Sequence, residues 1–505
     1  MRYREKFEKF SVFSRVLTAK EIFYCGKMTG EESPQIQIRD SIDDRNGASE
    51  MGAVVLLSLT AMGAGILSLP VTLYYGGMVA GLLALAVFSG LADYSLIVIV
   101  RCAKMTQEKS ILAMANNLYG KRGKVFVMAT LLILLIFAQI SMLIVIGDVL
   151  SPAVQYIATG DVYQTSCDTA GEHNCHAPSW AGTTLCDDTC TLPPFWTSRL
   201  AVSVLSTALY FPLSLFDKLK ALSASSTLAV GALFGVMVSL CVELGDKGVI
   251  DKITVANPSW QLMMIPSILS CAFCCHFNIL EVQREMRPSI RHRIEYVIHK
   301  SMLGVVFVIY ALTALVGYLI FGDRLHDCTD ILTCFDSTDK LMLACSVAVG
   351  CVNIVKMPLI MIPTRGLFLE LCAEFRHGFC TSRKKRSTRE DEDLESSLLR
   401  VDEQSKITPI KLTRTLRVCM MLAMCISNVV LAYLLSDLAL GFSVIAFTSG
   451  MAVCFTIPGA LYDAALVRSG ATNISQRFAS LSLVVFGVIM ALVALVGTIC
   501  FIKYN

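Results

Sequence analysis

The sequence predicts an all-helical integral membrane protein, and composition and chain patterning carry that prediction. Hydrophobic residues make up 55% of the 505 residues, charged residues make up only 16%, and the mean hydropathy is +0.63. A water-soluble domain of this size has no interior large enough for so much apolar surface. Apolar runs about as long as a bilayer is thick recur from Met51 onward. The chain is therefore expected to cross a membrane many times.

The first fifty residues are polar and mixed in charge, with no apolar run before Met51. They predict a cytosolic N-terminal tail over 1–50 without a cleavable signal peptide. Eleven transmembrane helices are expected in the remainder, over residues 51–505. Their predicted ranges are 51–74, 78–101, 125–151, 196–216, 221–243, 262–281, 300–321, 339–363, 413–436, 439–465 and 476–502.

Basic residues gather in alternate connections, which orients these spans. Lysines and arginines are concentrated in the connections between spans 2 and 3, 6 and 7, and 8 and 9, whereas the segment 152–198 contains none. Cytosolic loops carry the excess of basic residues. The N-terminus and the loop 365–412 are therefore predicted to be cytosolic, and 152–198 and the C-terminus non-cytosolic.

Six of the twenty cysteines fall in two loops that the charge rule places outside the cytosol. Disulfides persist in such compartments. Metal binding is the alternative, because Cys175 with His176 offers soft ligands, but no paired Cys-x-x-Cys knuckle is present. We therefore predict disulfides, with open connectivity, and no metal site. The candidates are Cys167, Cys175, Cys186, Cys190, Cys328 and Cys334.

The first predicted span is interrupted by Gly63, Gly65 and Pro70, all of which weaken a helix. A helix in the hydrocarbon tolerates such a break only where it is buried in protein or lines a wet cavity. Secondary transporters use discontinuous helices to present free backbone groups to a substrate. The break predicts a carrier with its binding site near the start of the chain.

Several short motifs, taken together, resemble the amino acid/auxin permease family. They cover the chain from Met51 to about Asp463. The resemblance implies a leucine-transporter-type fold, with five-plus-five inverted repeats and one extra helix, and amino-acid transport driven by protons or sodium. The motifs are Gly63-Ala-Gly-Ile-Leu-Ser-Leu-Pro70, Ile146-Gly-Asp-Val-Leu-Ser-Pro152, Phe211-Pro-Leu-Ser-Leu215 with Lys220-Ala-Leu-Ser223, Cys275-His-Phe-Asn278, and Met357-Pro-Leu-Ile-Met-Ile-Pro-Thr-Arg365.

Under that fold, spans one and six are unwound and together bind the substrate. The amides near Gly65 begin a half-helix whose positive end suits an α-carboxylate, although the same glycines could serve tight helix packing. In span six Phe273 would cover the substrate, or act only as a core aromatic, while nearby carbonyls accept from the ammonium. The candidate substrate-binding residues are Thr60, Gly63, Ala64, Gly65, Ile66, Phe273 and Cys274.

Three ionisable residues within the spans are candidates for ion coupling: Lys356, His276 and Asp93. Intramembrane ionisable residues are usually functional, although His276 could be a neutral histidine with one hydrogen bond. Lys356 lies about 13 Å deeper than Arg365 at 1.5 Å per helical residue. In sodium-coupled members of this fold, oxygens from spans one and eight bind the ion. An ammonium in that region would repel sodium.

The sequence therefore predicts a secondary active amino acid transporter that works by alternating access, with proton coupling or exchange. The alternatives are a sodium-coupled transporter and an amino-acid sensor that does not transport. The expected partners are the amino acid, a proton and the lipid bilayer, with no nucleic acid, no cofactor and no enzymatic activity; partner proteins are not predicted. The plasma membrane and a vacuolar or lysosomal membrane both fit.

Overall fold

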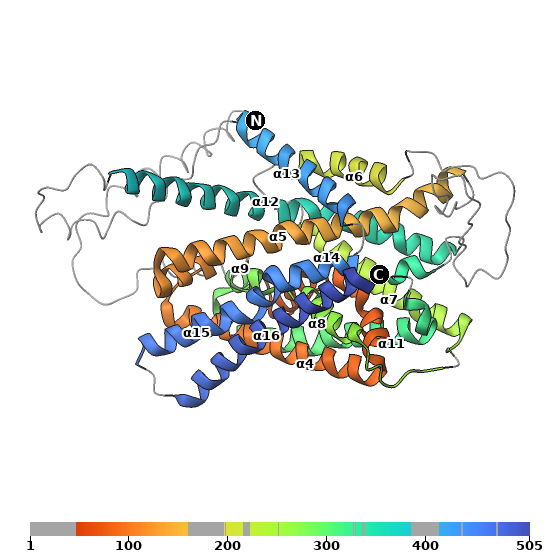
Figure 1. Cartoon of the computed structure of the whole chain (residues 1–505), viewed down its shortest axis with the longest axis horizontal. Coiled ribbons are helices and arrows are strands. Elements are labelled where there is room, and N and C mark those ends of the chain that lie inside the picture. Colours follow the sequence, from red (N-terminus) through yellow and green to blue (C-terminus); the bar gives the residue numbers. More distant parts are fainter. Residues whose placement is uncertain are drawn as a thin grey trace, which may run out of the picture.

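The structure is a computed structural model that describes residues 47–159, 196, 198–215, 223–250, 252–326, 328, 330–335, 339–384, 414–435, 438–470 and 473–504. Within these residues the fold is helical, and Figure 1 shows long helices aligned in one elongated bundle. Residues 1–46 of the predicted tail 1–50 and most of the segment 152–198 lie outside the described residues, together with Cys167, Cys175, Cys186 and Cys190.

The α-helices follow the predicted spans in order. They are α3 Glu50–Ala61, α4 Leu69–Thr106, α5 Ile111–Thr159, α6 Arg199–Ser214, α7 Ser223–Lys247, α8 Ile265–Ala272, α9 Ile279–Glu285, α10 Ile294–His299, α11 Phe307–Phe321, α12 Lys340–Lys384, α13 Arg414–Leu434, α14 Leu438–Ile445, α15 Ile457–Arg468 and α16 Ile474–Tyr504. In the described residues, seven helical stretches are long and apolar enough to cross a membrane, and three apolar helices are shorter. Each of the eleven predicted ranges overlaps a helix, while the number of crossings stays a prediction.

Several helices extend beyond the predicted spans. α5 continues to Thr159, so the predicted loop at 152–198 begins with a helical end, and α12 continues to Lys384, into the predicted loop 365–412. The predicted ends of these two spans, at residues 151 and 363, were set by hydropathy alone. A helix needs no apolar side chains to continue into water, because its backbone hydrogen bonds are internal.

The first two spans are joined without a loop. α4 runs through the predicted boundary and bends at Gly77, which has a φ of +78°. A Cβ at Gly77 would lie 2.5 Å from the Cα of Ala256. The extended segment containing Ala256 supplies the backbone partners at this bend, since the amides of Met78 and Val79 donate to the carbonyls of Thr254 and Val255. Glycine permits both the conformation and the close approach.

The core forms where α4, α5, α11 and α12 pack around the broken spans, with α5 lying along α12 and α4 against α11. Ion pairs connect helices at both ends of the bundle. Lys124 of α5 contacts Glu370 and Glu374 of α12 at 2.7 and 3.1 Å, and Arg199 of α6 contacts Asp148 of α5 at 2.8 Å.

The last helix, α16, lies at the edge of this bundle. Only 28% of its most apolar window is buried, against 72% for the window in α5. Its exposed residues include many large aliphatic side chains, such as Leu492 and Ile499. An apolar helix with so much free surface is suited to face lipid. This position matches the extra eleventh helix that the resemblance implies.

Candidate functional site

The first span is broken where the glycines predict. α3 ends at Ala61, Met62 and Gly63 leave the helical conformation, and a 3-10 turn, η2 (Ala64–Ser68), leads directly into α4. The break thus exposes carbonyls at the end of α3 and amides at the start of η2. Thr60 lies on the last turn of α3, where its hydroxyl donates to the Leu56 carbonyl at 2.9 Å.

The sixth span is also broken, although it contains no glycine there. α8 ends at Ala272, Phe273 to Cys275 are not helical, and a short 3-10 turn, η6 (His276–Asn278), precedes α9. The resemblance predicted this unwinding, and the structure confirms it. Phe273 is 1% exposed and its ring packs edge-on against Tyr310, with the centroids 5.2 Å apart.

The two breaks lie directly against each other at Gly65. A Cβ on Gly65 would lie 2.8 Å from the Cα and 3.1 Å from the N of Ala272. Glycine is therefore required for the backbones of η2 and α8 to approach. Gly63 differs, because the nearest heavy atom to a Cβ there is 4.0 Å away. Gly65 therefore has the tight-packing role that the sequence left as an alternative. Its predicted role in binding the substrate carboxylate stays a prediction.

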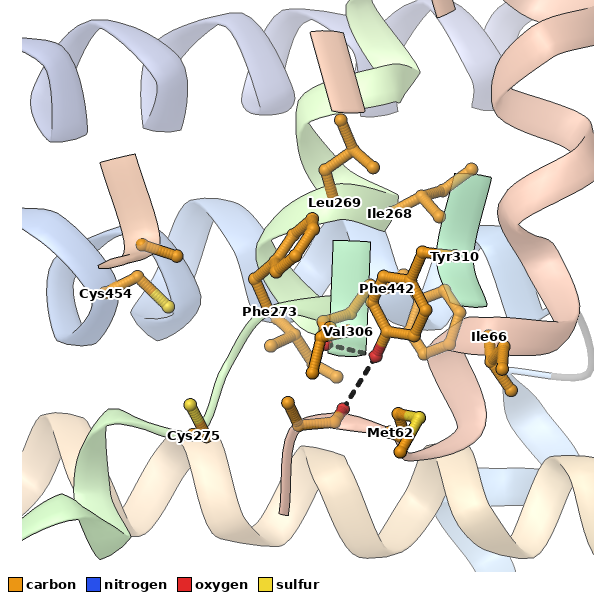
Figure 2. Packing of buried hydrophobic residues seen from close by; sticks show 14 of the residues in the cluster. Met62, Ile66, Ile268, Leu269, Phe273, Cys275, Val306, Tyr310, Phe442 and Cys454 are labelled. Carbon is orange, nitrogen blue, oxygen red and sulfur yellow. Dashed lines mark hydrogen bonds between the residues drawn. The ribbon is translucent and has the colours of Figure 1, made fainter. Parts of the chain in front are cut away.

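Tyr310 of α11 connects the breaks, as Figure 2 shows. Its hydroxyl oxygen lies 2.9 Å from the carbonyl oxygen of Ala61 and 2.8 Å from that of Ala272. Both alanines end a helical segment, so their carbonyls lack the i+4 amide donor that interior residues have, although the Ala61 carbonyl also accepts from the Gly63 amide at 2.8 Å. A hydroxyl has one hydrogen for these two acceptors. Tyr310 is not among the predicted site residues, because an aromatic residue in an apolar span carries no local signal of this contact.

Lys356 reaches the same region from α12. Its ammonium donates to the carbonyl of Met62 at 3.3 Å. One turn earlier on α12, Val352 packs with Leu59 of α3. Among the described residues, no carboxylate lies within ion-pair distance of the Lys356 ammonium. The structure therefore brings the Lys356 side chain from span eight to the break in span one, the region where the resemblance implies the sodium site of sodium-coupled members, and its role in coupling stays a prediction.

Buried hydroxyl groups without a hydrogen-bond partner lie on the broken spans and on a helix that packs against the first of them. In the described part of the chain they include those of Ser68, Ser141 and Ser267, which lie on η2, α5 and α8. Both α5 and α8 contact η2. Buried polar groups in proteins almost always have partners, so such exceptions suggest a place for water or a ligand. The first-span motif contains Ser68, whereas no motif in the sequence contains Ser141 or Ser267.

The other two coupling candidates lie away from Lys356 and have their own partners. His276 is fully buried and its Nε2 lies 2.5 Å from the Ser95 hydroxyl of α4. Asp93 contacts the half-exposed His299 of α10 at 2.8 Å, and its second oxygen is buried without a partner. His276 thus makes the one hydrogen bond that the neutral alternative required, and neither group's role in coupling is tested.

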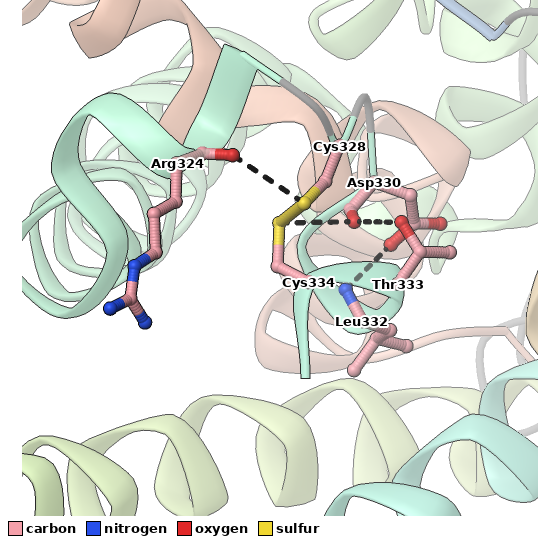
Figure 3. Close-up of a disulfide and its surroundings, with 6 residues drawn as sticks. All are labelled: Arg324, Cys328, Asp330, Leu332, Thr333 and Cys334. Atoms are coloured by element: carbon pink, nitrogen blue, oxygen red, sulfur yellow. Dashed lines mark hydrogen bonds between the residues drawn. A yellow bond between two sulfur atoms is a disulfide. The ribbon is translucent and has the colours of Figure 1, made fainter. Parts of the chain in front are cut away.

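One predicted disulfide lies in the described residues. Cys328 and Cys334 are bonded, with Cα atoms 5.5 Å apart, in the loop between α11 and α12 (Figure 3). Asp330 lies inside this small ring and is 2% exposed. One carboxylate oxygen accepts from the Leu332 amide at 2.9 Å, and the other has no partner among the described residues. Burial raises the pKa of Asp330 to about 7, although the Leu332 hydrogen bond opposes this shift.

Comparison with known proteins agrees with these features. The chain is 28% identical over 304 residues to amino acid transporter AVT6B of Arabidopsis thaliana, covering 58% of this chain and 60% of the relative. It is 23% identical over 301 residues to a Danio rerio protein provisionally named sodium-coupled neutral amino acid transporter 11, covering 58% and 59%. The aligned part thus spans less than two thirds of either relative.

The fold has a solved counterpart. The inward-facing structure of Mhp1, which has the leucine-transporter-type fold, superimposes with a TM-score of 0.50 at 10% identity, covering 91% of this chain and 92% of Mhp1. The fold is therefore an all-α membrane bundle of this type. Residues 46–500 match the model of the family described as transmembrane amino acid transporter protein. The chain accordingly belongs to the transmembrane amino acid transporter protein family.

Proposed function

We propose that this protein is a secondary active transporter, not an enzyme, which moves an amino acid across a membrane by alternating access. The observation that carries the proposal is the convergence of two broken helices on one hydroxyl. The carbonyls of Ala61 and Ala272 both lie within 2.9 Å of the Tyr310 oxygen. An ammonium group carries three hydrogens and so could satisfy both carbonyls at once. The names of the relatives support an amino acid as substrate.

The ammonium and the carboxylate of the amino acid are proposed to bind backbone carbonyls and backbone amides, respectively. The ammonium takes the carbonyl acceptors at the ends of α3 and α8. The α-carboxylate binds the amides of Ala64 and Gly65, where η2 begins and continues into α4. Phe273 and Ile66, both buried beside this region, would cover the substrate. The unpartnered hydroxyls of Ser68 and Ser267 are available to a polar substrate atom or a water.

Lys356 is proposed to take the place of a coupling sodium ion. Its ammonium lies 3.3 Å from a carbonyl of the span-one break, so a second cation there would be repelled. Coupling to a proton, or exchange, is then the favoured mode, and sodium coupling is the alternative. His276 and Asp93 are candidate proton-carrying groups, since both are buried and each has a nitrogen or oxygen atom without a partner among the described residues.

The proposed orientation has the N-terminus in the cytosol and the C-terminus outside it. The basic connections support this orientation, and so does the disulfide between Cys328 and Cys334, which would lie on the oxidising side. The buried Asp330 on that side would be neutral in an acidic compartment. A vacuolar or lysosomal membrane therefore fits well, and the plasma membrane remains the alternative.

The test is uptake into proteoliposomes that contain the purified protein. A panel of radiolabelled amino acids is offered at two values of pH, with sodium or with choline. We expect uptake of at least one amino acid that depends on pH and persists in choline. Strict sodium dependence would refute the role of Lys356, and binding of an amino acid without any uptake would refute transport.

A further inference from the structure

Two cysteines and a histidine from spans six and ten form a largely buried cluster whose ligand atoms lie close enough together to hold a metal ion. One ligand atom from each of Cys274, His276 and Cys454 lies within 4.8 Å of the other two. Cys274 and His276 belong to the broken segment of span six, and Cys454 lies in a π-helical stretch between α14 and α15 (Ala452–Thr456). Figure 2 shows Cys454 beside the broken segment that carries Phe273 and Cys275. Such π-helical insertions are frequent at functional sites.

The hydrogen bonds around His276 prepare one of its nitrogens to bind a metal. The Ser95 hydroxyl donates to the carbonyl of Ala92 at 3.0 Å, so it can accept from Nε2 of His276, which lies 2.5 Å away. That assignment places the ring hydrogen on Nε2. Nδ1 then carries a free lone pair, and it is buried without a partner among the described residues. Metal-binding histidines are oriented in this way by a hydrogen bond at the other nitrogen.

We propose that Cys274, His276 and Cys454 form a binding site for a zinc ion. Thiolate sulfur and imidazole nitrogen are preferred ligands of zinc. Zinc–sulfur bonds of about 2.3 Å and a zinc–nitrogen bond of about 2.1 Å put two sulfur ligands about 3.8 Å apart and a sulfur and a nitrogen ligand about 3.6 Å apart. Closure of the cluster therefore shortens each of its distances, none above 4.8 Å, by roughly 1.2 Å at most. Each thiol releases its proton on binding.

Charge balance favours zinc over a monovalent soft cation. Two thiolates and a neutral imidazole carry two negative charges, which a divalent cation neutralises. Copper(I) would leave one net negative charge on the cluster, and neither the neutral imidazole nor the Ser270 carbonyl that the Cys454 sulfur contacts supplies a cation to offset it. Burial of an uncompensated charge is costly, especially within a membrane.

A bound zinc ion would join the broken part of span six to span ten. The Cys454 sulfur already lies 3.7 Å from the Ser270 carbonyl on α8. Ser95 would connect the same site to α4. If the breaks move during transport, as the proposed function requires, zinc would hold these three helices together and slow uptake. This consequence rests on the proposed function, whereas the binding of zinc does not.

The first experiment measures zinc on the purified full-length protein by mass spectrometry of the metal. After chelation and dialysis against zinc, we expect about one ion per chain in the wild type. Cys274→Ser and Cys454→Ser should lose it. Cys271→Ser is the matched control, because Cys271 lies three residues before Cys274 and its sulfur contacts the Phe442 carbonyl outside the cluster. Equal zinc in all three variants, or none in the wild type, would overturn the proposal.

A second measurement needs no variant and so does not depend on folding of a mutant. Cobalt(II) titrated into the metal-free wild type should give the thiolate-to-cobalt charge-transfer absorption, which zinc then removes. Absence of that absorption, or a disulfide between Cys274 and Cys454 found by mass mapping of the protein as purified without reductant, would refute a thiolate site. Zinc should also slow uptake by the wild type and by Cys271→Ser, but not by Cys454→Ser. A protein that binds zinc and transports nothing would refute the transport function alone.

Discussion

Replacement of Gly65 by alanine is the sharpest test of how the two broken helices meet. The added Cβ would lie 2.8 Å from the Cα of Ala272, and ordinary contact begins at 3.4 Å. The backbones of η2 and α8 must therefore separate by roughly 0.6 Å, or distort. Overpacking of this kind typically costs about 1–3 kcal/mol. The obstacle is backbone, so rotation of a side chain cannot relieve it.

Gly63→Ala is the matched control, two residues away in the same break. A Cβ there meets nothing closer than 4.0 Å, and the backbone at Gly63, with φ −102°, is accessible to alanine. We expect Gly65→Ala to lower the thermal midpoint of the detergent-purified protein by a few degrees and to reduce uptake strongly. Gly63→Ala should change both quantities little.

The assay compares unfolding by fluorescence-detected chromatography with uptake into proteoliposomes at equal protein content. A wild-type midpoint and wild-type uptake in Gly65→Ala would show that the backbones are not in contact there. An equal loss of thermal midpoint and uptake in Gly63→Ala would show that the break tolerates no side chain at either glycine. The close approach of Gly65 to Ala272 would then not explain the effect of Gly65→Ala. Loss of uptake at an unchanged midpoint would instead favour the ligand-binding role of Gly65.

Three further predictions concern polar groups near the breaks and in the outer loop. Lys356→Met should reduce uptake by at least about tenfold, equivalent to ~1.4 kcal/mol, whereas the exposed Lys109→Ala should not; equal uptake in both would make Lys356 a structural lysine only. Tyr310→Phe leaves the carbonyls at both breaks without their shared donor, so stability without substrate should fall by about 1–3 kcal/mol, and a saturating amino acid should restore part of the loss; denaturation with and without substrate measures both. The Asp330 carboxyl has a higher pKa when folded, about 7 against 3.8, so its stabilising effect is complete below about pH 4 and is lost as the pH rises through 7. Asp330→Asn should therefore flatten the fall in thermal midpoint between these values of pH, and an unchanged slope would contradict the burial of this carboxyl.

The sequence by itself determined that this protein resides in a membrane and where its first span is broken. So many long apolar runs are stable only within a lipid bilayer. Segments that cross a bilayer must form their backbone hydrogen bonds internally, as a helix does. Gly63, Gly65 and Pro70 are local weaknesses in such a segment, and α3 ends just before them at Ala61. The depth of Lys356 also follows from local geometry, since a helix advances by a fixed rise per residue. The break in span six has no local signal, and only the resemblance predicted it.

Only the tertiary structure decided which groups meet at these breaks. The Tyr310 hydroxyl is separated by 249 and 38 residues in the chain from the two carbonyls that it contacts. Cys274 and Cys454 are also far apart in the chain, and no pattern in the sequence pairs them. Helical periodicity tells which face of a helix is apolar, but within a membrane nearly every face is apolar. The partner of each face is then fixed by close packing of whole helices, in which one missing Cβ at Gly65 determines how near two backbones can come.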